Sequence, residues 1–287
     1  MLIGMIIPDQ TNPFFAELSL HLQTHLAQLG VPLVVLSSDG NTLQELACLQ
    51  ILDTLSVSGI VFVSAGDNND ILEILRRSTK PHIIIDRELP EVTNNCDFVL
   101  TDNTKGIWLA VEHLVARGHR SLAFIQGCQN TDPGRTRMLA FKDAANALDI
   151  PEERLRVFEG KFDYSSGFNA AQEIVQEAGP RPTAVVASND LSAIGALQCF
   201  HQNGVIVPRD ISLIGFDDIT MCQWLHPRLT TIRQEQIELT RWAAEYVLSR
   251  VSGEYAGKPR SETIVPRLIE RESTRNITLD RAENSCS

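Results

Sequence analysis

Short apolar runs alternate with longer amphipathic segments along most of this 287-residue chain. The first run, residues 2–7, has the length of a buried strand and ends in the polar turn at residues 8–13. An amphipathic helix is predicted next, with Pro13 at its first position and Asn12 as its N-terminal cap. Because helices follow strands throughout, the pattern predicts parallel sheets with right-handed crossover connections.

The strand–helix unit recurs in two series. The first series predicts strands over residues 31–36, 59–63, 81–85 and 98–100, and helices over residues 43–55, 70–77 and 104–117. The second series predicts strands over residues 122–125, 156–158, 184–187 and 211–216, and helices over residues 136–148, 165–177 and 191–203. The chain is long for one hydrophobic core, so we expect an α/β fold with two doubly wound parallel-sheet subdomains.

Charge and cysteine usage restrict the partners of the chain. Its formal net charge is −11, whereas a domain that grips nucleic acid normally has a basic face. No apolar run approaches the ~20 residues of a membrane span, and residues 2–7 lack the flanks of a signal peptide. The six cysteines form no CxxC pair, which indicates free thiols in a reducing compartment. We therefore expect a cytoplasmic protein that does not bind membranes.

Motifs for catalysis and cofactor binding are missing from the sequence. It has no GxGxxG after the first strand, no GxxxxGK[ST] and no GxSxG, so no cofactor and no enzymatic activity are expected. His21 and His25 have a metal-ligand spacing, but no third ligand is near, so we predict no metal site. The pair Asp217-Asp218 allows acid–base chemistry or a ligand-binding carboxylate at a strand end, and the absence of a nucleophile favours the second interpretation.

Polar and aromatic residues follow several predicted strands. In open α/β sheets these strand ends form the ligand cleft. Planar polar groups bind paired hydroxyls, and aromatic rings stack on the C–H face of a sugar. Taken one at a time, Arg137 also fits a surface ion pair, Phe162 fits the core, and Asn189 or Asp190 fits a helix cap. Together with Asp217 and the exposed pair that we expect at Phe14 and Phe15, they indicate a sugar site.

The chain resembles the effector-binding core of the LacI/GalR family of bacterial repressors. The resemblance is carried by seven segments that occur in the same order along the chain. Each segment is weakly diagnostic alone, but seven in sequence, spanning essentially residues 2–271, are specific. They are IGMIIPDQTNPFF from Ile3, TDNTKGIWLAVEHLVARGHRSLAFIQG from Thr101, RTRMLAF from Arg135, PTAVVASNDLSAIGAL from Pro182, VPRDISLIGFDD from Val207, PRLTTIRQ from Pro227 and VPRLIERES from Val265.

The resemblance implies two periplasmic binding protein-like (type I) subdomains joined by three crossovers, which we place near Asp102, Arg233 and Glu262. The N-terminal subdomain would comprise residues 1–101 and 234–261, and the C-terminal one residues 102–233 and 262–273. Residues 274–287 would form a polar tail, and we expect the chain after Arg271 to be loose. A homodimer is also implied, with the helices at 43–55 and 70–77 as candidate interfaces.

The resemblance also implies a function and a site. A small, sugar-like effector would bind between the subdomains and control operator binding allosterically. The family's helix-turn-helix headpiece would precede Leu2 and is absent from this sequence, so operator DNA would be contacted only through that headpiece. Seven residues match the family's ligand positions: Phe14, Phe15, Arg137, Phe162, Asn189, Asp190 and Asp217.

Two other functions share parts of this pattern. A sugar-binding receptor of a transport system would have the same architecture, but it would need a signal peptide. An enzyme on a doubly wound fold would need a nucleophile–base pair or a cofactor loop. The sequence favours the regulator over both.

Overall fold

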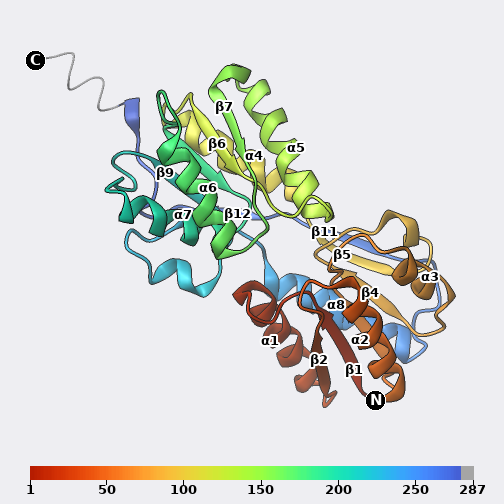
Figure 1. Ribbon diagram of the computed structural model, residues 1–287. Helices are drawn as coiled ribbons and strands as arrows, with labels where there is room; N and C mark the ends of the chain where they lie inside the picture. The colour runs from red at the N-terminus through yellow and green to blue at the C-terminus, as the bar shows by residue number, and fades with distance from the viewer. Residues whose placement is uncertain (279–287) are drawn as a thin grey trace, which may run out of the picture. The chain divides into compact units, whose positions relative to one another are not determined.

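The computed structural model describes residues 1–278, and in it the chain forms two compact α/β units (Figure 1). The first unit comprises residues 1–102, 130–133 and 235–264. The second comprises residues 103–129, 134–234 and the described residues from 265 onward. In this division the chain passes from one unit to the other after residues 102, 129, 133, 234 and 264. The predicted fold class, two doubly wound sheets of the periplasmic binding protein type, is confirmed.

The first unit has a six-stranded sheet in the order β11-β5-β4-β3-β1-β2, and every neighbouring pair is parallel. Its central strands are apolar and buried, as expected of a parallel sheet that helices cover on both faces. The strands are β1 (Ile3–Ile7), β2 (Leu33–Ser37), β3 (Gly59–Phe62), β4 (His82–Ile85), β5 (Asp97–Thr101) and β11 (Ser261–Ile264).

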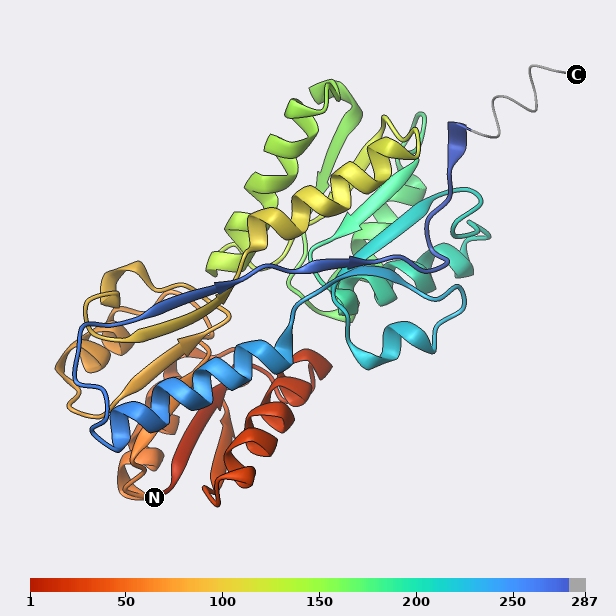
Figure 2. The ribbon, with the colours of Figure 1, turned by 180° about the vertical axis from the view of Figure 1, so that it is seen from behind.

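Two pairs of helices cover this sheet. Helices α1 (Pro13–Gln28) and α8 (Gln236–Val251) pack against each other, and Figure 2 shows them side by side over the sheet. Helices α2 (Thr42–Thr54) and α3 (Asn69–Arg77) pack together and contribute to a separate core cluster with β1, β3 and β4. The short 3-10 helix η1 (Pro90–Val92) adjoins α3.

The second unit repeats this plan, with the strand order β12-β10-β9-β8-β6-β7. Here the edge strand β12 runs antiparallel to β10, and the other pairs are parallel. The strands are β6 (Leu122–Ile125), β7 (Leu155–Phe158), β8 (Ala184–Ala187), β9 (Ser212–Asp217), β10 (Thr230–Arg233) and β12 (Arg267–Ile269).

Four long helices cover the second sheet. Helices α4 (Asn103–Ala116) and α5 (Asp132–Ala147) share one core cluster with the strands. Helices α6 (Tyr164–Gln176) and α7 (Asp190–Gln202) pack closely, because each has a glycine where they meet. A Cβ on Gly167 would lie 2.1 Å from the carbonyl oxygen of Ser192, so only glycine permits this contact. The 3-10 helices are η2 (Glu152–Arg154) and η3 (Thr220–Gln223).

Local sequence signals account for several helix ends. Oδ1 of Asn12 accepts a hydrogen bond from the Phe14 backbone N–H at 3.0 Å, and Pro13 is the first helical residue, as predicted. Gly118 follows α4 with φ +88°, the left-handed conformation of a glycine that ends a helix. The elements after β9, namely β10, α8, β11 and β12, were not predicted.

The chain after Arg271 is held to the second unit as far as the structure describes it. The backbone N–H of Arg275 donates to Oγ of Ser212 at 3.1 Å, and that of Ile277 donates to the Arg117 carbonyl at 2.9 Å. The side chain of Ser273 is fully buried. The expected loose tail is therefore wrong for residues 272–278, while residues 279–287 lie outside the described part.

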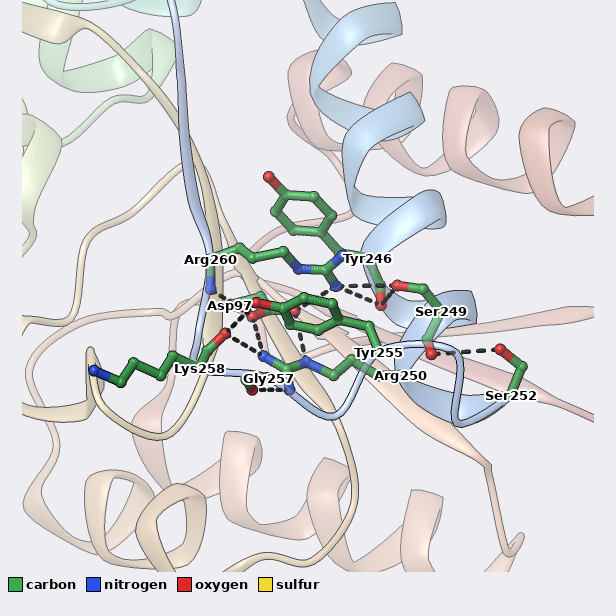
Figure 3. Close-up of polar contacts among 9 residues, drawn as sticks. All are labelled: Asp97, Tyr246, Ser249, Arg250, Ser252, Tyr255, Gly257, Lys258 and Arg260. Carbon is green, nitrogen blue, oxygen red and sulfur yellow. Dashed lines mark hydrogen bonds and ion pairs between the residues drawn. The ribbon is translucent and has the colours of Figure 1, made fainter.

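A buried charged cluster fixes the start of β5 in the first unit. The Asp97 carboxylate accepts hydrogen bonds from the guanidinium groups of Arg250 and Arg260 at 2.7–3.0 Å (Figure 3). The Arg260 guanidinium also lies 3.9 Å from the Tyr246 ring centre and 4.1 Å from that of Tyr255. These hydrogen bonds lower the pKa of Asp97 although burial acts to raise it. The cluster ties the end of α8 and the residue before β11 to β5.

The structure also bears on membrane spans and on the cysteines, within residues 1–278. No helix in this range is long and apolar enough to cross a membrane. The five cysteines within it are free, and Cys286 lies outside the described residues.

Candidate ligand-binding site

Both sheets reverse their strand order at the same internal position. In the first unit the chain runs from β1 outward to β2 and then crosses back to β3 on the other side of β1; β6, β7 and β8 repeat this order in the second unit. Ligands of open α/β sheets bind beyond the carboxyl ends of the strands at such a reversal. The segments after β1, β3, β6 and β8 are therefore where each unit is expected to hold polar ligand contacts.

Arg137, on α5, is the centre of a buried polar cluster at this edge of the second unit. Its side chain is 3% exposed. Its Nε donates to Oδ1 of Asn103 at 2.7 Å, and its Nη1 donates to the carbonyl oxygen of Ser188 at 2.7 Å. The same Nη1 lies 3.8 Å from Oδ1 of Asp217, at the end of β9. Groups from α4, α5, β9 and the segment after β8 thus converge on one guanidinium.

Asp217 is held in an unusual backbone conformation. Its φ is +126°, and that of the following residue, Asp218, is +59°, both in the region that favours glycine. Oδ1 of Asp217 accepts a hydrogen bond from Nε2 of Gln234 at 2.8 Å. Strained backbone of this kind persists where surrounding contacts enforce it and clusters at functional sites.

Aromatic rings frame the guanidinium of Arg137. Its central carbon lies 3.7 Å from the ring centre of Phe216 and 5.8 Å from that of Phe162. Phe162 is half-buried with φ +66°, and its carbonyl accepts a hydrogen bond from Nδ2 of Asn189 at 2.9 Å. The Phe162 ring occupies the space over Gly127, where an added Cβ would lie 2.1 Å from it. The predicted residues Arg137, Phe162, Asn189 and Asp217 thus lie around one edge of the second sheet.

Asn189 and Asp190 have different roles from each other. Asn189 is the N-cap of α7, since its Oδ1 accepts from the Ser192 backbone N–H at 3.0 Å. The Asp190 side chain is completely buried, and its oxygens accept from Thr231 Oγ1 at 2.5 Å, the Ile219 backbone N–H at 2.9 Å and Cys222 Sγ at 3.0 Å. Burial raises the pKa of the Asp190 carboxyl. The prediction that Asp190 contacts ligand is therefore corrected: it joins α7 to the segments around β9 and β10.

The first unit has its own polar cluster at the matching sheet edge. Nη1 of Arg87, just after β4, donates to the carbonyl oxygen of Ser64, just after β3. Asp86 precedes it with φ +69°, and its Oδ2 lies 3.7 Å from Nε of Arg87. Glu45, fully buried on α2, accepts from the Ala65 backbone N–H, and burial raises its pKa to about 7. The cluster pairs a carboxylate with a guanidinium, as the second unit does.

Phe14 and Phe15 lie in the first unit at the start of α1. Both are buried, at 2% and 5% exposed, so the expectation of an exposed pair is wrong. Their rings meet edge to face at 5.1 Å, and the Arg87 guanidinium lies 5.6 Å from the Phe15 ring centre. Phe15 therefore belongs to the same neighbourhood as the Arg87 cluster.

Four polar residues of these clusters were missed in the sequence: Asn103, Gln234, Asp86 and Arg87. A usable signal existed for the last two, because Asp86-Arg87 directly follows an apolar strand, as Asp217-Asp218 does. Asn103 and Gln234 also follow strands, β5 and β10, but the sequence pattern predicts β5 only over residues 98–100 and does not predict β10. Their contacts with Arg137 and Asp217 depend on the fold.

The arrangement suits a neutral polyol. Carboxylate oxygens accept, guanidinium N–H groups donate and amides do both, which matches the mixed character of hydroxyls. Within residues 1–278, no group of three or more His, Cys, Asp or Glu side chains could hold a metal ion. The cluster around Arg137 contains Ser188, whose buried hydroxyl has no hydrogen-bond partner among the described residues and therefore no general base beside it there.

Comparison with known proteins agrees with this geometry. Residues 111–274 match the family described as periplasmic binding protein-like domain. The chain is 29% identical to an HTH-type transcriptional repressor PurR from Photobacterium profundum over 276 residues, which are 96% of this chain and 81% of the relative. It is also 29% identical to the ribose operon repressor of Haemophilus influenzae over 271 residues, covering 94% of this chain and 80% of that protein.

Solved structures show the same architecture. A LacI family transcriptional regulator from Enterococcus faecalis V583, with bound ribose, is 30% identical with a TM-score of 0.84, and the match covers 96% of this chain and 99% of that one. A second LacI family regulator, from Enterococcus faecium and also with bound ribose, is 29% identical with a TM-score of 0.85 over the same shares of both chains. These relatives are regulators and not enzymes or transport receptors, which favours the regulator among the three functions considered.

Proposed function

The chain belongs to the LacI family of transcriptional regulators, and we propose that its effector is a pentose sugar bound by the cluster around Arg137. The chain is the effector-binding core of a regulator and has no enzymatic role. Phe14, Phe15, Phe162 and Asn189 are proposed as further contacts.

The observation that carries this proposal is the buried pairing of Arg137 with Asp217. A desolvated guanidinium and carboxylate 3.8 Å apart can hold two neighbouring hydroxyls, one as donor and the other as acceptor. Asn103 and Gln234 already fix these two side chains through bonds of 2.7 and 2.8 Å, so the site is preorganised. Phe162 supplies an aromatic face for the sugar's C–H surface.

The choice of a pentose is supported by the relatives. One relative is named a ribose operon repressor, and the two Enterococcus regulators were solved with bound ribose. The Asp86–Arg87 pair of the first unit offers a second carboxylate and guanidinium for the same class of ligand.

Isothermal titration calorimetry of the purified chain tests the proposal. The panel should hold D-ribose, D-xylose, L-arabinose, D-glucose and a purine base at equal concentrations. We expect ribose to bind best. Binding of the purine base alone, with no heat from any sugar, would overturn the proposal and redirect attention to a nucleobase effector.

Control of operator DNA is proposed to require a DNA-binding headpiece. The chain carries a net charge of −11, and the predicted and described helices include no basic recognition helix. Its relatives are HTH-type repressors, and their regulatory role supports a cytoplasmic location. A sugar that shifts the conformation of the core would then alter operator affinity by its differential binding to two states.

We further propose that the chain forms a homodimer through an apolar groove of the second unit. The groove is lined by side chains of α6, α7 and the segments after α7 and η3, among them Tyr164, Leu197, Ile206 and Trp224. Trp224 is 74% exposed and Ile206 46%, so this groove presents large apolar side chains to solvent, as interaction surfaces do. A second copy of the chain would bury them. Helix α2, which the sequence predicts as an interface, has exposed apolar residues at Leu43 and Ile51, with Leu55 just after its end. Its role as an interface stays a prediction.

Replacing Trp224 by glutamate should convert the dimer to a monomer. Burying a charge in an apolar interface is unfavourable, and central aromatic residues dominate interface energies, often by 2 kcal/mol or more. Sedimentation at micromolar concentration should give about 64 kDa for the wild type and 31.8 kDa for the variant. The matched control Leu139→Glu places the same charge at an exposed apolar residue of α5, outside the groove and outside the predicted interface helices, and should leave the dimer intact. A wild type that sediments as a monomer would contradict the dimer itself.

A further inference from the structure

Two consecutive aspartates at the end of β9 bind different partners. Asp217 faces Arg137 and Gln234, as described above. Asp218 binds Arg233 and Arg271 instead. Both have positive φ: Asp218 lies in the left-handed region at +59°, which aspartate can adopt, whereas +126° at Asp217 is a strained value. Something in the surroundings must hold this backbone in place.

Asp218 has the contacts for that role. Its Oδ2 accepts from Nε of Arg233 at 2.7 Å, and its Oδ1 accepts from Nη2 of Arg271 at 2.6 Å. The Asp218 side chain is 2% exposed, so both ion pairs form with the carboxylate shielded from water. Arg271 is itself fixed, because its Nη1 donates to the Leu229 carbonyl at 2.8 Å.

The two aspartates hold two adjacent residues of the neighbouring strand end. Gln234 follows Arg233 in the chain, as Asp218 follows Asp217, and the β9–β10 register pairs Asp217 with Arg233. Asp217 therefore binds the side chain of Gln234 while Asp218 binds that of Arg233. The backbone N–H of Gln234 also donates to the Asp217 carbonyl at 3.3 Å. Rotation of the backbone at either aspartate would break both side-chain contacts.

We propose that Asp218 is a positioning residue for the sugar site, whose two ion pairs hold the strained backbone and so aim the Asp217 carboxylate at Gln234 and Arg137. The inference rests on the proposed function for its effect on affinity, but not for its effect on the position of Asp217. Asp218 itself binds no ligand in this scheme. Its influence on the sugar passes entirely through Asp217.

A double-mutant cycle separates this role from a general loss of stability. Asp218→Ala should weaken ribose binding about tenfold in calorimetry, because contacting residues couple by amounts of this order. In the Asp217→Ala background, Asp218→Ala should cause no further loss. A purely structural role would give the same fold-loss in both backgrounds, and that additivity would overturn the proposal, as would an unchanged affinity in the single variant.

Three further measurements keep this test valid if the variant fails to fold or if the chain binds no sugar. Glu272→Gln removes an exposed ion pair with Arg228 in the same unit and should leave affinity unchanged. If Asp218→Ala does not fold, Arg233→Gln and Arg271→Gln each remove one ion pair and take its place. A crystal structure of the unliganded variant should show the Asp217–Gln234 hydrogen bond broken. An Asp217 that keeps its φ and this bond would refute positioning even if the chain binds no sugar at all.

Discussion

Replacing Arg137 by methionine should lower the affinity for ribose by more than a hundredfold. The change removes the donor for the sugar and also leaves the Asp217 carboxylate buried without its nearest cation. Each charge-assisted hydrogen bond that the guanidinium would donate to the sugar is worth about 1.5–3 kcal/mol, so the loss of two such bonds gives more than a hundredfold at about 1.4 kcal/mol per factor of ten. Methionine keeps most of the side-chain volume, so the contact with Phe216 is partly retained.

Calorimetry measures the affinity, and circular dichroism shows whether the variant is folded. Arg156→Met is the matched control, because Arg156 is a half-exposed arginine of the same unit that pairs with Glu177 away from the cluster. The control should bind ribose like the wild type. A folded Arg137→Met variant with wild-type affinity would show that the sugar binds elsewhere.

Replacing Gly195 by alanine should destabilise the second unit by about 3 kcal/mol, the upper range for overpacking a tight contact. A Cβ on Gly195 would lie 2.0 Å from the carbonyl oxygen of Tyr164 and 2.8 Å from the backbone nitrogen of Phe168. These atoms belong to the backbone of α6, so relief requires the two helices to move apart. Without this clash the substitution would stabilise the helix by about 0.5–1 kcal/mol, because alanine has a higher helix propensity than glycine. The predicted loss therefore has the opposite sign to the propensity effect.

Urea unfolding followed by circular dichroism measures this loss. Gln202→Ala, an exposed substitution on the same helix and outside the groove, should change the free energy of unfolding by less than about 0.5 kcal/mol. A Gly195→Ala variant as stable as the wild type would mean that α6 and α7 do not pack as closely as described.

Most of the fold could be predicted because the core strands are apolar and their helices amphipathic. Strand β1 and helix α1 are examples, with Asn12 and Pro13 marking the helix start. Strands β10, β11 and β12 could not be predicted in this way. They are short and rich in polar residues, such as Thr230–Arg233, so pairing with a neighbouring strand decides their conformation. Helix α8 does have an apolar face, with Leu239, Ala243 and Val247 buried, and its pattern was missed.

The site was only partly accessible to sequence reasoning. Asp217 could be predicted because it ends a strand, and Arg137 because the pattern predicts a helix that starts at residue 136. In the structure α5 starts at Asp132, so Arg137 lies in its second turn. Asn103 lies 34 residues from Arg137, and Gln234 lies 17 residues from Asp217, so their contacts follow from the sheet order and not from local pattern.

The prediction for Asp190 failed for a spatial reason. Its position at the start of α7 was right, but the direction of its side chain depends on Gly215. Because Gly215 lacks a Cβ, the Asp190 carboxylate approaches within 2.1 Å of where that atom would be. The contact between Asp190 and Gly215 depends on the packing of α7 against β9, which the sequence alone does not specify.

A crystal structure of the chain grown with D-ribose tests the central claim most directly. We predict density for one sugar with hydroxyl oxygens within hydrogen-bond distance of the Asp217 carboxylate and the Arg137 guanidinium, and with Phe162 against its C–H face. Density for ribose that touches neither Asp217 nor Arg137 would contradict the account.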